Sequence, residues 1–251
     1  MKKLLNAAFA AMATLCASNS CFAIGPADYV YTPIVEEGEK EIDFKFGTTK
    51  PKKESRESAA SLGFGYGLTD YWFSEVYVKY KRENADGRGQ ASFFDAFEWE
   101  NKFQLTTQGE NFVDLGLILE IERPQDRREG LEVRFGPLLQ KEFGKTQLNL
   151  NILLERNYHA AESNPLRLSY QWQAKYRLHK EFEFGAQGFG EFGAWNHFAP
   201  RSEQRHLAGP AIFGKLGLGA RNAITYNLAF LTDLGDSPHS KTLRTQVEYE
   251  F

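Results

Sequence analysis

Charged and other polar side chains recur at every second residue along several stretches of this sequence. Arg167, Lys175 and Arg177 alternate with apolar residues in one stretch, and Glu120 and Glu122 do so in another. Because successive side chains of an extended strand point to opposite faces, this spacing gathers charge on one face of each strand. The predicted charged face, which could line a pore, carries Glu75, Lys79, Glu98, Glu100, Lys102, Glu120, Glu122, Arg134, Arg167, Lys175, Arg177, Glu183, Glu191, Arg244 and Glu248.

The charged face has a basic part and an acidic part. Arg167, Lys175 and Arg177 form a basic ladder on one strand, whereas glutamates dominate the charged positions of residues 98–122. Held apart across a lumen, the two parts would set up a transverse field that orients a small charged solute. In a crowded lumen they would instead pair and neutralise one another. The sequence leaves both interpretations open.

The five histidines are the natural candidates for acid–base or metal chemistry; they are His159, His179, His197, His206 and His239. A triad could be drawn from Ser240, His239 and Asp236, but adjacent residues of an extended chain point apart. His197 and His206 lack the further ligands that a metal site needs. The sequence therefore predicts neither a metal nor a cofactor.

Gly63, Gly65 and Gly67 fall on the same side of one predicted strand as the charges. They could leave room for residues 24–39 or for an inward-folded loop. We favour the alternative that small residues ease the coiling and closure of a sheet. The surrounding Gly-Phe-Gly-Tyr-Gly string is not predicted to bind phosphate, because no helix or βαβ pattern follows it.

The elements that position these residues are predicted strands. The two-residue alternation begins at Lys40 and recurs in twelve segments, and bacterial single-chain membrane barrels have an even number of strands. Longer polar loops, such as residues 82–92 and 195–205, follow the odd-numbered segments, and shorter turns follow the even-numbered ones. Both chain ends are therefore expected on the periplasmic side. The least regular segment places Asp95 and Asn101 on its apolar face.

The second face of each segment is apolar, which favours a membrane barrel over a soluble β-sandwich. Aromatic residues gather at segment ends, as they do at membrane interfaces; these are Tyr71, Trp72, Phe143, Tyr176, Phe182 and Trp195. A shift of the strand register by one residue would point charged side chains toward lipid, which would cost roughly 2–4 kcal/mol per midplane Lys or Arg. No later stretch reaches the roughly 18 apolar residues of a membrane helix.

The N-terminal residues have the pattern of a secretory signal peptide. Lys2 and Lys3 precede an apolar stretch at residues 4–15, and a small-residue step ends at Ala23, where cleavage is expected. Both cysteines, Cys16 and Cys21, lie in this segment, so the mature chain is expected to form no disulfide or thiolate–metal site. The predicted organisation is a signal peptide at 1–23, a periplasmic N-terminal lead-in at 24–39 and a transmembrane β-barrel at 40–251.

The last strand carries a family resemblance. Leu243, Val247, Tyr249 and the terminal Phe251 share one face, with charged and amide side chains on the other. This stretch resembles the C-terminal strand of Gram-negative outer-membrane β-barrels, in which it is the signal for the barrel-assembly machinery. The resemblance implies an all-β, twelve-stranded antiparallel barrel in the outer membrane. Its implied partners are that machinery, outer-membrane lipid and lipopolysaccharide. Without a basic block, no nucleic-acid partner is expected.

Three functions are compatible with such a barrel. The favoured one is a narrow channel for passive transport of small hydrophilic or charged solutes. The first alternative is a closed structural or binding barrel that uses its outer loops. The second is an outer-membrane hydrolase. An outer-rim protease like the omptins could use Asp126, Asp233, Asp236 and His239, but no local motif matches. The Ser–His pair of an outer-membrane phospholipase is not evident, although twelve strands is that family's number.

Overall fold

A computed structural model describes residues 25–50, 56–85, 89–219, 222–235 and 240–251. The predicted signal peptide at 1–23 lies outside the described residues. Within these ranges the chain is all-β apart from one short 3-10 helix, η1 (Arg127–Glu129). None of the described helical structure is long and apolar enough to cross a membrane.

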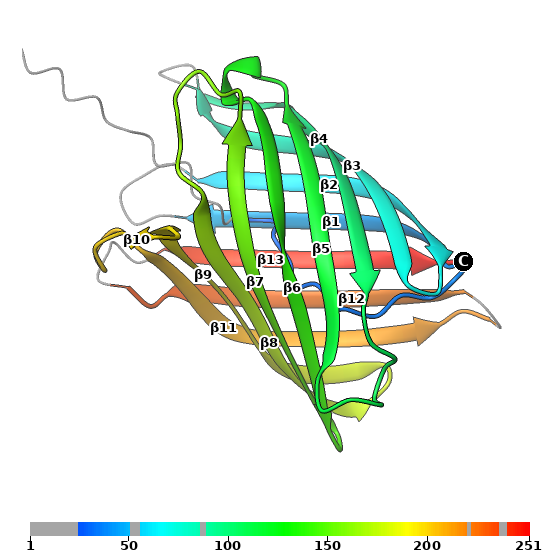
Figure 1. The fold of residues 1–251 in the computed structure, drawn as a ribbon. Coiled ribbons are helices and arrows are strands. Elements are labelled where there is room, and N and C mark those ends of the chain that lie inside the picture. Colours follow the sequence, from blue (N-terminus) through cyan, green and yellow to red (C-terminus); the bar gives the residue numbers. More distant parts are fainter. Residues whose placement is uncertain (1–24, 51–55, 86–88, 220–221, 236–239) are drawn as a thin grey trace, which may run out of the picture.

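Twelve of the described strands form a closed antiparallel barrel (Figure 1). They are β1 (Lys40–Lys50), β2 (Glu57–Thr69), β3 (Trp72–Ala85), β4 (Gly89–Gln104), β5 (Asp114–Pro124), β6 (Leu131–Phe143), β7 (Thr146–Tyr158), β8 (Arg167–His179), β9 (Phe182–Ala194), β11 (Arg205–Gly217), β12 (Ala223–Asp233) and β13 (Lys241–Glu250). The extra strand, β10 (His197–Phe198), forms a small hairpin with β9. The predicted all-β, twelve-stranded antiparallel barrel is therefore confirmed.

The barrel closes where the last strand meets the first. β13 pairs with β1 in a register that sets Phe44 opposite Val247, and it pairs with β12 on its other side. Closure matters in lipid because an unpaired edge would leave backbone N–H and C=O groups without partners. Leu243 and Val247 point outward and are exposed, and Phe251 follows the strand at the same end as the start of β1. Recognition of this strand by an assembly machinery stays a prediction.

The strands expose alternate residues to the outside and bury the others. Along β1, for example, Ile42, Phe44 and Phe46 are exposed, whereas Asp43 and Lys45 are buried. This pattern is inverted relative to a soluble protein, because the apolar side chains face outward and the polar ones fill the interior. It is the arrangement that a lipid environment requires.

Several predicted connections differ from the structure. Residues 82–92 were expected to form a loop, but β3 and β4 continue through most of that range, with Arg82 opposite Ser92 and Ala85 opposite Gly89. The expected loop at 195–205 contains β10. The connection between β4 and β5, residues 105–113, lies at the short-turn end yet is longer than a tight turn. Polar composition thus marked these segments without showing whether they pair.

The two polar residues on the apolar face of β4 have separate explanations. The register shifts between Lys79 and Tyr80, which makes Asp95 the extra residue of a β-bulge. Asp95 consequently lines an inner cavity instead of facing lipid. Asn101 keeps its outward position, where the Trp72 indole donates a hydrogen bond to its carbonyl at 3.0 Å and covers it to 2% exposure.

Residues 25–39, which we call the plug, run inside the barrel, where the blue trace lies in Figure 1. A Cβ on Gly47 would overlap the Pro26 carbonyl, and one on Gly67 would overlap the Glu36 carbonyl. Gly47 lies toward the long-loop end of β1 and Gly67 toward the short-turn end of β2. The described part of the predicted lead-in therefore threads the lumen from one half to the other. Which membrane side each end occupies stays a prediction.

The outward face of Leu62 provides a test of membrane depth. Leu62 is exposed near the middle of β2, and a lysine there should destabilise the barrel by about 2–4 kcal/mol, because a midplane charge lacks hydration. Leu178 is similarly exposed near the end of β8, where the same replacement should cost only about 0–1 kcal/mol. Urea unfolding in lipid vesicles measures both free energies. Equal costs would contradict the placement of Leu62 in the bilayer.

Candidate functional site

The candidate site is the barrel interior around the plug. Two plug tyrosines donate hydrogen bonds to carboxylates of the wall: the Tyr29 hydroxyl to Glu100, at 2.5 Å, and the Tyr31 hydroxyl to Glu120. The tyrosine rings touch edge to face, with centroids 4.5 Å apart. The Tyr31 ring is 4% exposed and packs against three inward apolar side chains, Ile118, Leu138 and Leu153. The Tyr31 side chain thus packs into an apolar part of the barrel wall.

Backbone groups of the plug are also held by the wall. The Val35 amide donates to the Gln104 side chain at 2.7 Å, and the Asn151 amide donates to the Tyr31 carbonyl at 3.2 Å. At the short-turn end, the Gly38 amide donates to the Gly67 carbonyl at 2.8 Å, and the Gly67 amide donates to Glu39 at 2.9 Å. An extended segment cannot satisfy its own backbone groups, so these wall contacts are what allow it to stay in the interior.

Lys45 lies in a cage made by both the wall and the plug. Its ammonium is 3.4 Å from the Tyr29 ring centroid and 3.6 Å from that of Tyr77. The Asp43 carboxylate lies 3.3 Å from the same ammonium and accepts the Tyr77 hydroxyl at 2.8 Å. Lys45 is only 4% exposed. A buried ammonium needs such compensation, and Tyr29 supplies part of it from the plug.

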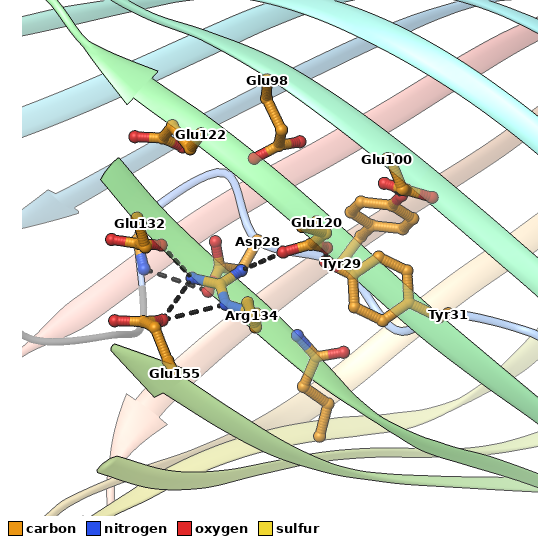
Figure 2. Close-up of polar contacts among 12 residues, drawn as sticks. Asp28, Tyr29, Tyr31, Glu98, Glu100, Glu120, Glu122, Glu132, Arg134 and Glu155 are labelled. Carbon is orange, nitrogen blue, oxygen red and sulfur yellow. Dashed lines mark hydrogen bonds and ion pairs between the residues drawn. The ribbon is translucent and has the colours of Figure 1, made fainter. Parts of the chain in front are cut away.

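Among the described residues, Arg134 forms the centre of the largest charged cluster (Figure 2). Its guanidinium lies 3.1 Å from Glu120, 2.8 Å from Glu155 and 3.4 Å from Glu132. Figure 2 also shows Asp28 of the plug beside this guanidinium. Because Glu120 also accepts the Tyr31 hydroxyl, the plug and the ion-pair cluster share one carboxylate.

Most of the predicted lining charges occur in ion pairs. Lys79 pairs with Glu98 at 3.0 Å and with Glu122 at 2.5 Å. On β8, the predicted basic ladder is paired throughout: Arg167 with Glu155 and Glu191, Lys175 with Glu183, and Arg177 with Glu142 and Glu183. These ion pairs support the interpretation in which the lining charges neutralise one another, and not the one in which they set up a transverse field.

The remaining predicted lining residues make other contacts. Glu100 accepts Tyr29, Lys102 lies over the Phe73 ring, and Arg244 lies 4.4 Å from the Phe189 centroid. Glu75 is 2% exposed, and Glu248 accepts a hydrogen bond from Gln246 at 2.6 Å. All fifteen predicted positions alternate with outward residues of their strands. Whether they line an open pore stays a prediction.

Two parts of the interior were missing from the sequence prediction. Amide side chains of β6 to β9 bond to one another across the wall; they are Gln140, Gln147, Asn149, Asn151, Gln171, Gln173 and Gln187. Inward apolar side chains of β9, β11 and β12 pack around Val30 of the plug; they are Phe189, Leu207, Ala211, Phe213, Ala229 and Leu231. Phe189 and Phe213 interrupt the polar face of their strands, and that interruption was the available signal.

The plug leaves space at the long-loop end. A cavity of about 170 Å³ lies between the first plug residues and β1 to β6. Carboxylates outnumber cations along its lining, where Asp28, Asp95 and Glu129 join Glu122 and Glu132. A solute entering this cavity would therefore meet a lining in which acidic side chains outnumber basic ones and to which Tyr29 and Tyr31 also belong.

The candidate catalytic groups do not assemble among the described residues. His206 faces the Tyr170 hydroxyl at 3.0 Å through Nδ1 and the Gln204 side chain at 2.9 Å through Nε2. Asp126 caps η1, and hydrogen bonds from Arg128 lower the pKa of its carboxyl to about 2, far from that of a base active near neutrality. Asp236 and His239 lie outside the described residues. No group of described residues could hold a metal ion.

Comparison with known proteins identifies the fold. No family model matches the sequence, and no curated protein matches it. An outer-membrane channel from Pseudomonas putida F1 is similar with a TM-score of 0.62 and 12% identity, over 90% of this chain and 98% of that chain. The NanC porin is similar with a TM-score of 0.55 and 9% identity, over 84% of this chain and 100% of that chain. The KdgM porin, solved with disordered oligogalacturonate, is similar with a TM-score of 0.54 and 8% identity, over 84% of this chain and 99% of that chain. The chain thus has the fold of porin-like outer-membrane barrels.

Tyr31→Phe tests how the plug is held. The variant removes the hydroxyl that donates to Glu120, and a hydrogen bond to a charged group is worth about 1.5–3 kcal/mol. The plug should therefore open roughly 10- to 100-fold more often. Native-state hydrogen exchange at the Val35 amide measures this opening. Tyr176→Phe, on the exposed outer face of β8, is the matched control. Unchanged exchange in Tyr31→Phe would contradict the proposed anchoring.

Proposed function

We propose that this protein is an outer-membrane channel for passive transport of small hydrophilic or charged solutes, and that the plug controls passage. The observation that carries the proposal is how the plug is held. Hydrogen bonds and one cation–π cage make up much of its contact with the wall, beside apolar contacts that centre on Val30 and Tyr31. Water can replace polar contacts when a segment withdraws, so release costs less than it would from an apolar core.

The likeness to outer-membrane channels supports the membrane location and the transport class. Neighbours of similar fold include two porins and a channel. A twelve-stranded barrel is wider than the eight-stranded barrels that side chains fill, and narrower than the 16–18-stranded porins with an aqueous channel. A bore of this size, once free of the plug, suits small solutes. With the basic ladder paired, the acidic cavity at the long-loop end favours cations.

One observation favours the second candidate, a closed structural or binding barrel. The interior cations Lys79, Arg134 and Arg177 each contact two or more carboxylates, so the wall is held together without any solute. In that case removal of the plug would leave a collapsed, non-conducting interior. The third candidate, a hydrolase, rests on Asp126, Asp233, Asp236 and His239, and of these Asp236 and His239 lie outside the described residues.

Single-channel conductance in planar bilayers distinguishes the first two candidates. The mature chain, from Ile24, should give rare or small steps, and a variant lacking residues 25–36 should give larger, cation-preferring steps. The channel proposal would be wrong if the folded, inserted deletion variant were as silent as the mature chain.

A reversible lock provides a second variant in case the deletion fails to fold. The Pro33 Cβ lies 2.8 Å and the Phe103 carbonyl 2.9 Å from the place where a Gly116 Cβ would stand. The plug and β5 must therefore both shift slightly before Pro33→Cys/Gly116→Cys reaches the disulfide range of about 3.5–4.5 Å. Oxidation should abolish the steps and reduction should restore them. Pro33→Cys alone, which cannot form the bond, is the matched control. Redox-independent conductance in the double variant would contradict control by the plug.

A further inference from the structure

A basic patch lies on the outer wall of the barrel, away from the lumen. Arg56 and Arg82 are exposed and lie with Phe46, Thr48 and Ser58 around a shallow hollow. The register explains this proximity, because Thr48 is opposite Ser58 and Ser58 is opposite Arg82. Arg56 immediately precedes β2 and lines the same hollow as Ser58. The hollow thus extends over β1, β2 and β3.

The floor of the hollow is fixed by short polar contacts. The Ser58 hydroxyl donates to Thr48 at 3.0 Å, and the Thr48 hydroxyl donates to the Glu57 carbonyl at 3.2 Å. The hydroxyl protons are thereby used within the protein. The guanidinium groups of Arg56 and Arg82 are the charged donors that line the hollow, and their planar, forked N–H groups match phosphate oxygens.

Further cations surround the hollow. Lys50 and Lys241 are opposite each other in the β1–β13 register, both are exposed, and both belong to the outward series of their strands. The neighbouring carboxylate, Glu57, belongs to the inward series, lies 3.8 Å from Lys81 and lines the inner cavity. The outer patch of Lys50, Arg56, Arg82 and Lys241 therefore presents concentrated positive charge.

The patch lies at one depth, immediately beyond the apolar band. One register row toward the short-turn end, Phe46, Ala60 and Tyr80 face outward, and the next row is Phe44, Leu62 and Val78. Their side chains form the surface that acyl chains would cover. A ligand with phosphate groups next to acyl chains would place the phosphates at Arg56 and Arg82 and its chains along Phe46 and Leu62.

We propose that Arg56 and Arg82 form a binding site for the phosphorylated headgroup of an outer-leaflet glycolipid, lipopolysaccharide. The inference rests on the proposed outer-membrane location and on the expected position of the long-loop end at the outer leaflet. It concerns the outer wall, so it is independent of conduction through the lumen. Free inorganic phosphate offers the same oxygens but no acyl chains. The lipid is favoured because the guanidinium pair stands directly above exposed apolar rows.

Binding of diphosphoryl lipid A to the detergent-solubilised full mature barrel, measured by native mass spectrometry, tests the site. Arg56→Gln/Arg82→Gln should weaken binding about 10-fold or more, because two charge-assisted contacts are lost. Arg56→Lys/Arg82→Lys keeps the charge and should still weaken binding, because the fork is lost. Arg123→Gln/Arg156→Gln, which removes two other exposed arginines of the long-loop end, is the matched control and should bind within about twofold of the unmodified chain.

Three results would overturn the proposal. The first is an equal loss in the Arg123/Arg156 control, which would show diffuse attraction. The second is binding of inorganic phosphate over the same concentration range as lipid A, which would show a free-anion site. The third is full retention of lipid A by Arg56→Gln/Arg82→Gln. Far-UV circular dichroism confirms that each variant is folded, and conductance of the same preparations separates failure of this site from failure of the channel proposal.

Discussion

The pairing of every barrel strand on both sides is the constraint on which the rest of this structure depends. In lipid an unpaired backbone edge has no water to satisfy it, so β13 must find β1 and the sheet must close. Closure fixes an inside and an outside, and strand alternation then assigns each residue to one of them. Polar side chains such as Asp43 and Glu155 consequently become interior residues that need partners within a narrow space.

The interior residues find their partners in three different ways. Near Arg134, charges pair with charges, whereas on β6 to β9 amides bond to amides, as between Gln147 and Asn149. Around Val30 the wall is apolar. The plug matches each region with a suitable group, because it brings hydroxyls to the carboxylates, the Tyr31 carbonyl to the Asn151 amide and an isopropyl group to the apolar sector. This correspondence indicates that the plug and the wall form one interior.

The barrel could be predicted from the sequence because strand alternation is a local, repeated signal. Its interior could be predicted only in part, because partners such as Tyr31 and Glu120 are distant in sequence and meet only after closure. Gly67 makes room for the plug, which was the alternative that the sequence analysis did not favour. Gly63 and Gly65 are instead covered by the neighbouring side chains Tyr77 and Phe73. The bulge at Asp95 appeared in the sequence only as a polar residue on the predicted apolar face, because one inserted residue reverses the alternation without showing whether the strand bulges there.

The covalent link between the plug and β1 has a quantitative consequence. The two are joined through Gly38, whose φ of 76° permits the sharp reversal from the interior into the wall. A group tethered by so short a connection has an effective concentration on the order of millimolar at its own site. A solute that binds Glu100 or Glu120 would therefore have to compete with plug tyrosines whose effective concentration at these carboxylates is constant. If the plug controls passage as proposed, occupancy by the solute would depend on its concentration, and the tether would set the concentration that a solute must reach before the barrel opens.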